Sequence, residues 1–337
     1  MKKTLIAVAA LSAMAASAMA ANVTVYGKID QGLQIQSQKT DGADRTTTWQ
    51  GVSGISSGSR WGLKGTEEIA DGYTVGFVLE SGFDGMTGKS GQSSRLFGRD
   101  AFVTLGTPFG SLTVGRTGML SDGCTGDIVS GPASPFGTSY GIAAATTTSF
   151  VGLGETRTDR AVRYVSPKFS GVQFHAEYAN MNGEDTASTK KRYGGVGVSY
   201  ANGPFYAAIA AETIKQPAGV TADDPQIYSI AANYDFGVAK VFGGYQYAKD
   251  SVWGGEKLNA GTLGVSAPVA GGTVMASIAY AKGDNDRKLT TGAIGYKYSL
   301  SKRTYIYTDL AYAQEDAATT EVTTKTTQFN VGLCHNF

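Results

Sequence analysis

The sequence holds few side chains that could perform covalent chemistry, since it contains only two histidines and two cysteines. His175 lies in an alternating stretch, residues 173–177, which would place it on the same face as Glu177. A hydrolase would need such a histidine beside a nucleophile, and the sequence contains no G-x-S-x-G motif. We therefore expect no enzyme and no catalytic residue.

The other candidates for chemistry are metal ligands. A structural zinc site takes about four Cys or His ligands at close spacings. The cysteines and histidines stand at positions 124, 175, 334 and 335, without the paired spacing of such sites. We expect no metal and no cofactor.

Composition excludes further classes of protein. The 29 basic and 28 acidic side chains lack the basic excess of a nucleic-acid-binding surface, so no nucleic-acid partner is expected. After the first twenty residues no apolar run is long enough for a transmembrane helix. The 46 glycines among 337 residues are about twice the usual share and suit a β-rich chain with many tight turns.

The first twenty residues have the features of a signal peptide. Lys2 and Lys3 precede an apolar stretch, and A-M-A at residues 18–20 forms a small-x-small cleavage site. We predict a cleaved signal peptide at 1–20 and a single exported domain at 21–337. Because exported proteins meet an oxidising compartment, Cys124 and Cys334 could form a disulfide, and two thiols are the alternative.

The exported chain alternates between apolar and polar residues in sixteen segments, as in V-T-V-Y-G-K-I-D at residues 23–30. Many are about ten residues or longer, which suits tilted strands that cross a bilayer. Short turns, such as 106–110, alternate with long polar connections, such as 83–93. This pattern predicts an all-β fold, a 16-stranded antiparallel transmembrane β-barrel with an aqueous lumen.

Alternation also assigns charged side chains to the lumen. Lys28 and Arg60 oppose the apolar faces of their segments, as do Asp30, Glu80 and Asp309. A basic residue on the lipid face near the bilayer centre costs about 2–4 kcal/mol, so inward arginines are favoured.

Six motifs in order along the chain resemble those of the Gram-negative general porin family. They are VTVYG at 23–27, SRWGLKGTEE at 59–68, FGRDAFV at 97–103, FGSLTVGR at 109–116, RAVRYVSP at 160–167 and GLCHNF at 332–337. The resemblance implies a homotrimer in the cell outer membrane, in contact with lipid and lipopolysaccharide. It also implies passive diffusion of ions and small hydrophilic solutes through each barrel.

In this family a long third loop folds into the lumen and faces basic wall residues. The resemblance assigns the connection 117–157 to that loop, with SPFG at 134–137 as its signature. It adds Arg99 and either Arg160 or Arg163 to the basic wall, and we prefer Arg160. Because the usual acid of the signature is missing, Asp122 and Asp127 are the acidic candidates. If Arg99 points inward, alternation sends Asp100 outward beside Phe102, which indicates either a protected contact in the trimer or a wrong register at this strand. We expect a mild preference for anions.

The last segment resembles the signal that outer-membrane assembly machinery recognises. Its outer face would hold Phe329, Val331, Leu333, His335 and Phe337, and the terminal Phe337 is the expected recognition residue.

Other interpretations remain open at this stage. The channel could be specific for one substrate, or the barrel could be an adhesin or carry an enzyme. The connection 117–157 could also be a flexible extracellular loop.

Overall fold

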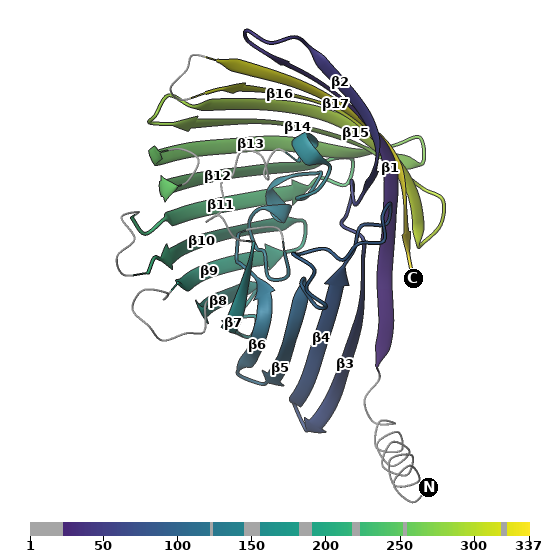
Figure 1. Ribbon diagram of the computed structural model, residues 1–337. Helices are drawn as coiled ribbons and strands as arrows, with labels where there is room; N and C mark the ends of the chain where they lie inside the picture. Colours follow the sequence, from purple (N-terminus) through teal and green to yellow (C-terminus); the bar gives the residue numbers. More distant parts are fainter. Residues whose placement is uncertain are drawn as a thin grey trace, which may run out of the picture.

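The computed structural model describes residues 23–121, 124–144, 156–181, 191–217, 223–251, 255–317 and 322–337. These residues form one antiparallel sheet and two short 3-10 helices (Figure 1). The strands are β1 (Thr24–Thr40), β2 (Thr46–Ser53), β3 (Arg60–Ala70), β4 (Tyr73–Gly82), β5 (Asp100–Thr107), β6 (Gly110–Gly118), β7 (Arg157–Val165), β8 (Val172–Asn180), β9 (Arg192–Asn202), β10 (Phe205–Lys215), β11 (Gln226–Asp235), β12 (Lys240–Ser251), β13 (Gly255–Val269), β14 (Gly272–Gly283), β15 (Lys288–Ser299), β16 (Thr304–Asp316) and β17 (Thr323–Asn336).

The sheet closes on itself, because β1 pairs along most of its length with β17. The other edge of β1 pairs with β2 through residues 31–38 and with β3 through residues 24–28. Thus β2 and β3 share one place in the wall, and the barrel has sixteen strand positions. This confirms the predicted 16-stranded antiparallel barrel. The predicted signal peptide, residues 1–20, lies outside the described residues.

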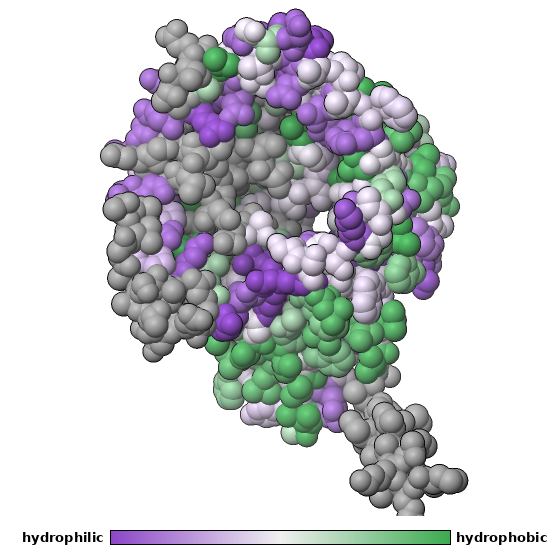
Figure 2. All heavy atoms as spheres, viewed as in Figure 1, coloured by the Kyte–Doolittle hydropathy of each residue, from purple (hydrophilic) through white to green (hydrophobic). Residues whose placement is uncertain are grey.

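The two faces of the wall differ as the alternation predicted. Val25, Leu33 and Val331 are exposed on the outer face, whereas Asp30 and Asn330 on the same strands are fully buried. Figure 2 shows hydrophobic side chains gathered over the outside of β3 to β6 and hydrophilic ones around the mouth of the ring. In a bilayer such a closed sheet leaves no strand edge with unpaired backbone groups. Among the described residues, no helix has the length and apolar character needed to cross a membrane.

The segment after β6 turns back onto the inner face of the wall. It carries helix η1 (Gly131–Ala133), which contacts β11 to β13, and helix η2 (Gly141–Ala143), which contacts β15 and β16. Figure 1 shows both helices within the ring of strands. We call its described residues, 119–121 and 124–144, the inner segment.

Candidate functional site

Three basic side chains converge on one side of the inner wall, and we call Lys28, Arg60 and Arg99 the basic cluster. Arg99 Nε donates to Glu80 Oε1 at 2.5 Å, and Arg60 Nη1 lies 3.7 Å from the same oxygen. Tyr26 donates its hydroxyl to the other oxygen of Glu80 at 3.0 Å. The side chains of Arg60 and Arg99 are 22% and 15% exposed, whereas that of Glu80 is 8% exposed. Positive charge is therefore more accessible here than negative charge.

An interruption of the wall between β2 and β3 completes this cluster. Ser57 lies in the gap, where its hydroxyl accepts hydrogen bonds from Lys28 Nζ at 3.1 Å and from Arg60 Nη2 at 2.6 Å. Its backbone N–H donates to Asp30 Oδ2 at 2.7 Å. Gly54 permits the turn, because its φ is +79° and a Cβ there would meet Gly58 Cα at 2.9 Å. The sequence analysis did not single out Ser57, because alternation does not reveal this gap between the two strands.

The prediction that Asp100 points outward is wrong. Strand β5 begins at Asp100, and Arg99 precedes it, so the two residues do not follow strand alternation. Asp100 is buried, and its carboxylate accepts a hydrogen bond from the hydroxyl of Thr125 in the inner segment. The side chains of Arg99 and Asp100 therefore both make their contacts inside the barrel.

The structure brings Arg163, and not the preferred Arg160, to the inner face. The pairing of β6 with β7 shifts register between Gly115 and Thr117, which leaves Arg160 in a bulge with φ +55°. Arg160 is exposed, and its Nη1 donates to the carbonyl of Met181 at 3.1 Å. A bulge changes which face the next side chains occupy, so simple alternation fails here.

Arg163 is buried in contacts that join the wall to the inner segment. It forms an ion pair with Glu177 on β8, and its Nη1 donates to the carbonyl of Thr125 at 3.0 Å. Its Nη2 also donates to the carbonyl of Gly118. Thr158 donates its hydroxyl to the other oxygen of Glu177 at 2.7 Å. With its donors occupied in this way, Arg163 is placed to anchor the inner segment.

Of the two acidic candidates, only Asp127 lies among the described residues, and Asp122 lies outside them. The carboxylate of Asp127 accepts hydrogen bonds from the backbone N–H groups of Val129, Ser130 and Gly131 at 2.7–2.9 Å. These contacts shape the turn before η1. The structure thus gives Asp127 a clear role in folding the inner segment.

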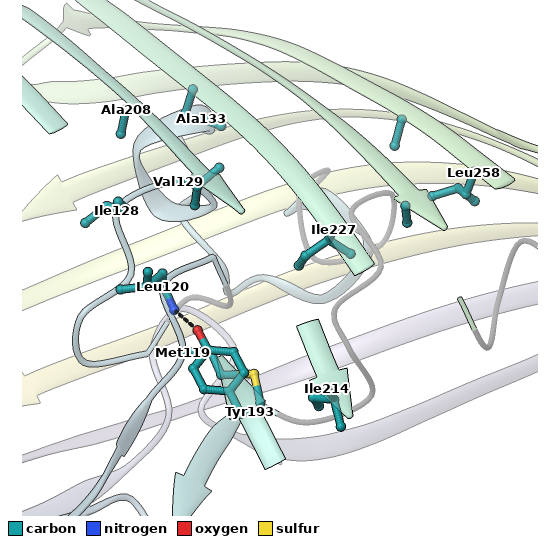
Figure 3. Close-up of a cluster of buried hydrophobic side chains, with 14 of the residues drawn as sticks. Met119, Leu120, Ile128, Val129, Ala133, Tyr193, Ala208, Ile214, Ile227 and Leu258 are labelled. Carbon is teal, nitrogen blue, oxygen red and sulfur yellow. Dashed lines mark hydrogen bonds between the residues drawn. The ribbon is translucent and has the colours of Figure 1, made fainter. Parts of the chain in front are cut away.

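The inner segment is also held by an apolar cluster that the sequence analysis missed. Met119, Leu120, Ile128 and Val129 pack against inward side chains of β9 to β13, including Tyr193, Ile214, Ile227 and Leu258 (Figure 3). Glu212 lies fully buried beside them, accepting from Leu120 N at 3.0 Å and from the Tyr193 hydroxyl at 2.6 Å. The apolar pairs Met119–Leu120 and Ile128–Val129 in this connection were the signal from which the cluster could have been predicted.

The other end of the inner segment rests on β14 to β17. Tyr140 packs edge-on against Phe136 and against Tyr307 of β16, with ring centroids 5.4 and 5.3 Å apart. Ser277 donates to the carbonyl of Ala143 at 3.1 Å. Burial is the main cause that raises the pKa of Tyr140. The segment is therefore anchored on both sides of the barrel.

Of the two alternatives left open for Cys124 and Cys334, the structure has the two thiols and not the disulfide. Cys334 is buried on β17, opposite Asp30 of β1. Cys124 lies in the inner segment, close to Gly118 at the end of β6. The two cysteines thus belong to different parts of the site.

His175 and Phe337, the remaining residues singled out in the sequence, both lie in the strands of the barrel wall or at their end. His175 Nε2 shares a hydrogen bond of 2.9 Å with Ser199 Oγ. Phe337 exchanges two backbone hydrogen bonds of 3.0 Å with Gly27, beside which its ring lies. Within the described ranges no group of three or more His, Cys, Asp or Glu side chains could hold a metal ion.

A closed barrel with an apolar outer face, a charged inner face and a segment folded against its inside defines the class of outer-membrane channels. The chain belongs to the Gram-negative porin family, whose model matches residues 7–318. It is an outer-membrane porin channel, and this family consists of channels rather than enzymes.

Two relatives illustrate the similarity. The chain is 34% identical over 339 residues to outer membrane porin protein 32 of Delftia acidovorans, covering 95% of this chain and 92% of that protein. It is 31% identical over 398 residues to an outer membrane porin protein of Bordetella pertussis, covering all of both chains.

Two solved structures have the same fold. An anion-selective porin from Comamonas acidovorans superposes with a TM-score of 0.73 at 27% identity, covering 94% of this chain and all of that one. OmpT of Vibrio cholerae in its trimer form superposes with a TM-score of 0.65 at 15% identity, with the same coverage.

Proposed function

We propose that this channel passes ions and small hydrophilic solutes by passive diffusion, through a constriction between the basic cluster and the inner segment, with a mild preference for anions. The observation that carries this proposal is that Arg60 and Arg99 share the single carboxylate of Glu80, while Lys28 joins Arg60 on the hydroxyl of Ser57. A ring of basic groups in a narrow pore attracts anions and repels cations.

The nearby carboxylates reduce this preference without removing it. Asp30 is fully buried, and its oxygens accept hydrogen bonds from the Tyr307 hydroxyl at 2.5 Å and from Ser57 N at 2.7 Å. Glu80 and Asp100 are buried as well, whereas the side chains of Arg60 and Arg99 are partly exposed, so the accessible charge of the cluster is positive. The porin from Comamonas acidovorans, which is 27% identical to this chain, is anion-selective, in agreement with this sign.

The constriction loop in this proposal is the connection 117–157. The contacts of Arg163, Glu212 and Tyr140 support it, because each joins the inner segment to a different part of the wall. On the acidic side, Asp127 is bound to backbone amides, so any acidic face toward the solute path depends on Asp122. Arg163 acts in this account as an anchor, and Arg160 has no place in the constriction.

We extend the proposal to assembly. A homotrimer is supported by the trimer form named for OmpT, whose fold this chain shares. Contact with outer-membrane lipid and lipopolysaccharide follows from the apolar outer face. Recognition of Phe337 by the assembly machinery is supported by its place at the seam where β17 meets β1.

Single-channel recording in a planar bilayer tests this function. A diffusion channel gives a current that rises steadily with KCl concentration and is not saturated by added sugars. A current that sugars block in a saturable way would instead favour the substrate-specific channel. A purified, folded protein that conducts no ions would refute the proposal.

A further inference from the structure

A second basic site lies at the rim of the barrel, where the long connections leave the sheet. It is a polar cavity of about 340 Å³, which falls in the size range of small-molecule sites. Its lining includes the basic side chains Arg95, Arg116, Arg157 and Lys191 and one acidic side chain, Asp159. We call these five residues the rim site; none of them belongs to the basic cluster.

The single carboxylate of the rim site is shared by two arginines. Arg95 Nη1 donates to both oxygens of Asp159 at 2.8 Å, and Arg116 Nη1 donates to Oδ1 at 2.6 Å. Arg116 Nε donates to the carbonyl of Gly98 at 2.8 Å, which fixes the position of this guanidinium. Because the single carboxylate Asp159 balances only one of the three arginines Arg95, Arg116 and Arg157, these side chains keep a surplus of positive charge in the cavity.

Arg157 supplies hydrogen-bonding capacity that the protein leaves unused. Its Nε is buried and has no hydrogen-bond partner among the described residues. Its Nη1 makes only a long contact of 3.5 Å with the hydroxyl of Thr156. A buried donor without an acceptor destabilises the protein, and a charged one does so more strongly. An anionic oxygen bound in the cavity would remove that cost.

The backbone that lines the cavity is strained. Gln92, Ser93 and Ser94 are three successive non-glycine residues in the left-handed region, with φ of +48°, +58° and +61°. Gln92 and Ser93 both line the cavity. This conformation is unfavourable for residues with a side chain, and such strain is common at binding sites.

We propose that the rim site binds a phosphate group. A phosphate offers several acceptor oxygens and up to two negative charges, which match the forked donors of several arginines better than one carboxylate does. The group could belong to a lipid headgroup or to a free phosphate compound, since both present the same oxygens. The rim site does not depend on the proposed selectivity of the basic cluster.

The test measures phosphate binding to the purified, folded full chain in detergent. Inorganic phosphate is titrated against chloride at constant ionic strength and followed by phosphorus NMR. In a second arm, the micelles carry phosphatidic acid or, as the control lipid, diacylglycerol without phosphate. Arg157→Gln and Arg95→Gln are compared with Arg287→Gln, another arginine in a long connection, whose Nε donates to Glu315 at 2.7 Å.

Saturable phosphate binding that weakens about tenfold or more in Arg157→Gln and Arg95→Gln, but less than about twofold in Arg287→Gln, is the expected result. Stronger binding to phosphatidic acid than to inorganic phosphate would identify the lipid as the source, and the reverse would identify the solute. Absence of saturable binding in both arms would overturn the proposal. So would an equal loss in Arg287→Gln, or rim variants that alter only subunit association and leave phosphate binding unchanged.

Discussion

Replacing Arg163 by glutamine tests how the inner segment is held against the wall. The substitution removes the charge that pairs with Glu177, whose side chain has no exposed surface. Removing one partner of a buried ion pair costs about 3–5 kcal/mol, because the other charge stays buried without compensation. We expect Arg163→Gln to lower the free energy of unfolding by that amount.

The double variant Arg163→Gln, Glu177→Gln separates charge burial from loss of contact. It removes both charges, so the remaining loss comes mainly from weaker contacts to the carbonyls of Gly118 and Thr125. At about 1 kcal/mol for each hydrogen bond, the double variant loses about 2 kcal/mol, less than the single variant. The coupling between the two positions is therefore at least about 1 kcal/mol.

Urea-driven unfolding of the protein in lipid vesicles measures these differences. Arg160→Gln is the matched control on the same strand, since Arg160 is exposed and its Nη1 donates to the backbone carbonyl of Met181. We expect the control to change stability by less than about 1 kcal/mol. A loss in Arg163→Gln no greater than in the control, or a double variant less stable than the single one, would refute the reasoning.

Three further predictions concern the inner segment, the cysteines and the seam. Gly126→Ala should destabilise the fold by more than about 1 kcal/mol in the same unfolding assay, because Gly126 has φ +98° and a Cβ would collide with Arg163. Gly137→Ala, with φ +62° but nothing within 4 Å of a Cβ, should cost less, and equal losses would count against the collision. Alkylation of the denatured protein without reductant should label both Cys124 and Cys334, and labelling that requires reductant would reveal a disulfide. Phe337→Ala should lower the yield of folded barrel in an assembly assay, because the ring lies beside Gly27 at the seam; an unchanged yield would show that the ring is dispensable.

The alternation of the sequence predicted the barrel because lipid and water impose opposite demands on the two faces of each strand. It placed Lys28 and Arg60 on the same side as Asp30 and Glu80. Alternation assigns side chains to the correct face only along an uninterrupted strand. It assigned Arg160 to the wrong face because a bulge adds a residue there, and Asp100 to the wrong face because Asp100 is the first residue of its strand.

The contacts of the inner segment could not be predicted from alternation, because they join residues far apart in the chain. Arg163 meets Gly118 and Thr125, and Glu212 meets Leu120, only once the wall has closed. Several inward positions of β9 to β13 are apolar where alternation predicts polar residues facing the lumen. They are apolar because the inner segment packs against them. Ser57 escaped notice because its role depends on the break between β2 and β3.

The zero-current potential of the channel in a KCl gradient measures whether the basic cluster makes the pore prefer anions. For the unmodified protein we expect a potential with the sign of the chloride equilibrium potential. We also expect a shift toward the potassium equilibrium potential when Arg60 and Arg99 are both replaced by glutamate, since these residues form the basic cluster around Glu80. A cation-selective channel, or a selectivity that the double substitution leaves unchanged, would contradict the account.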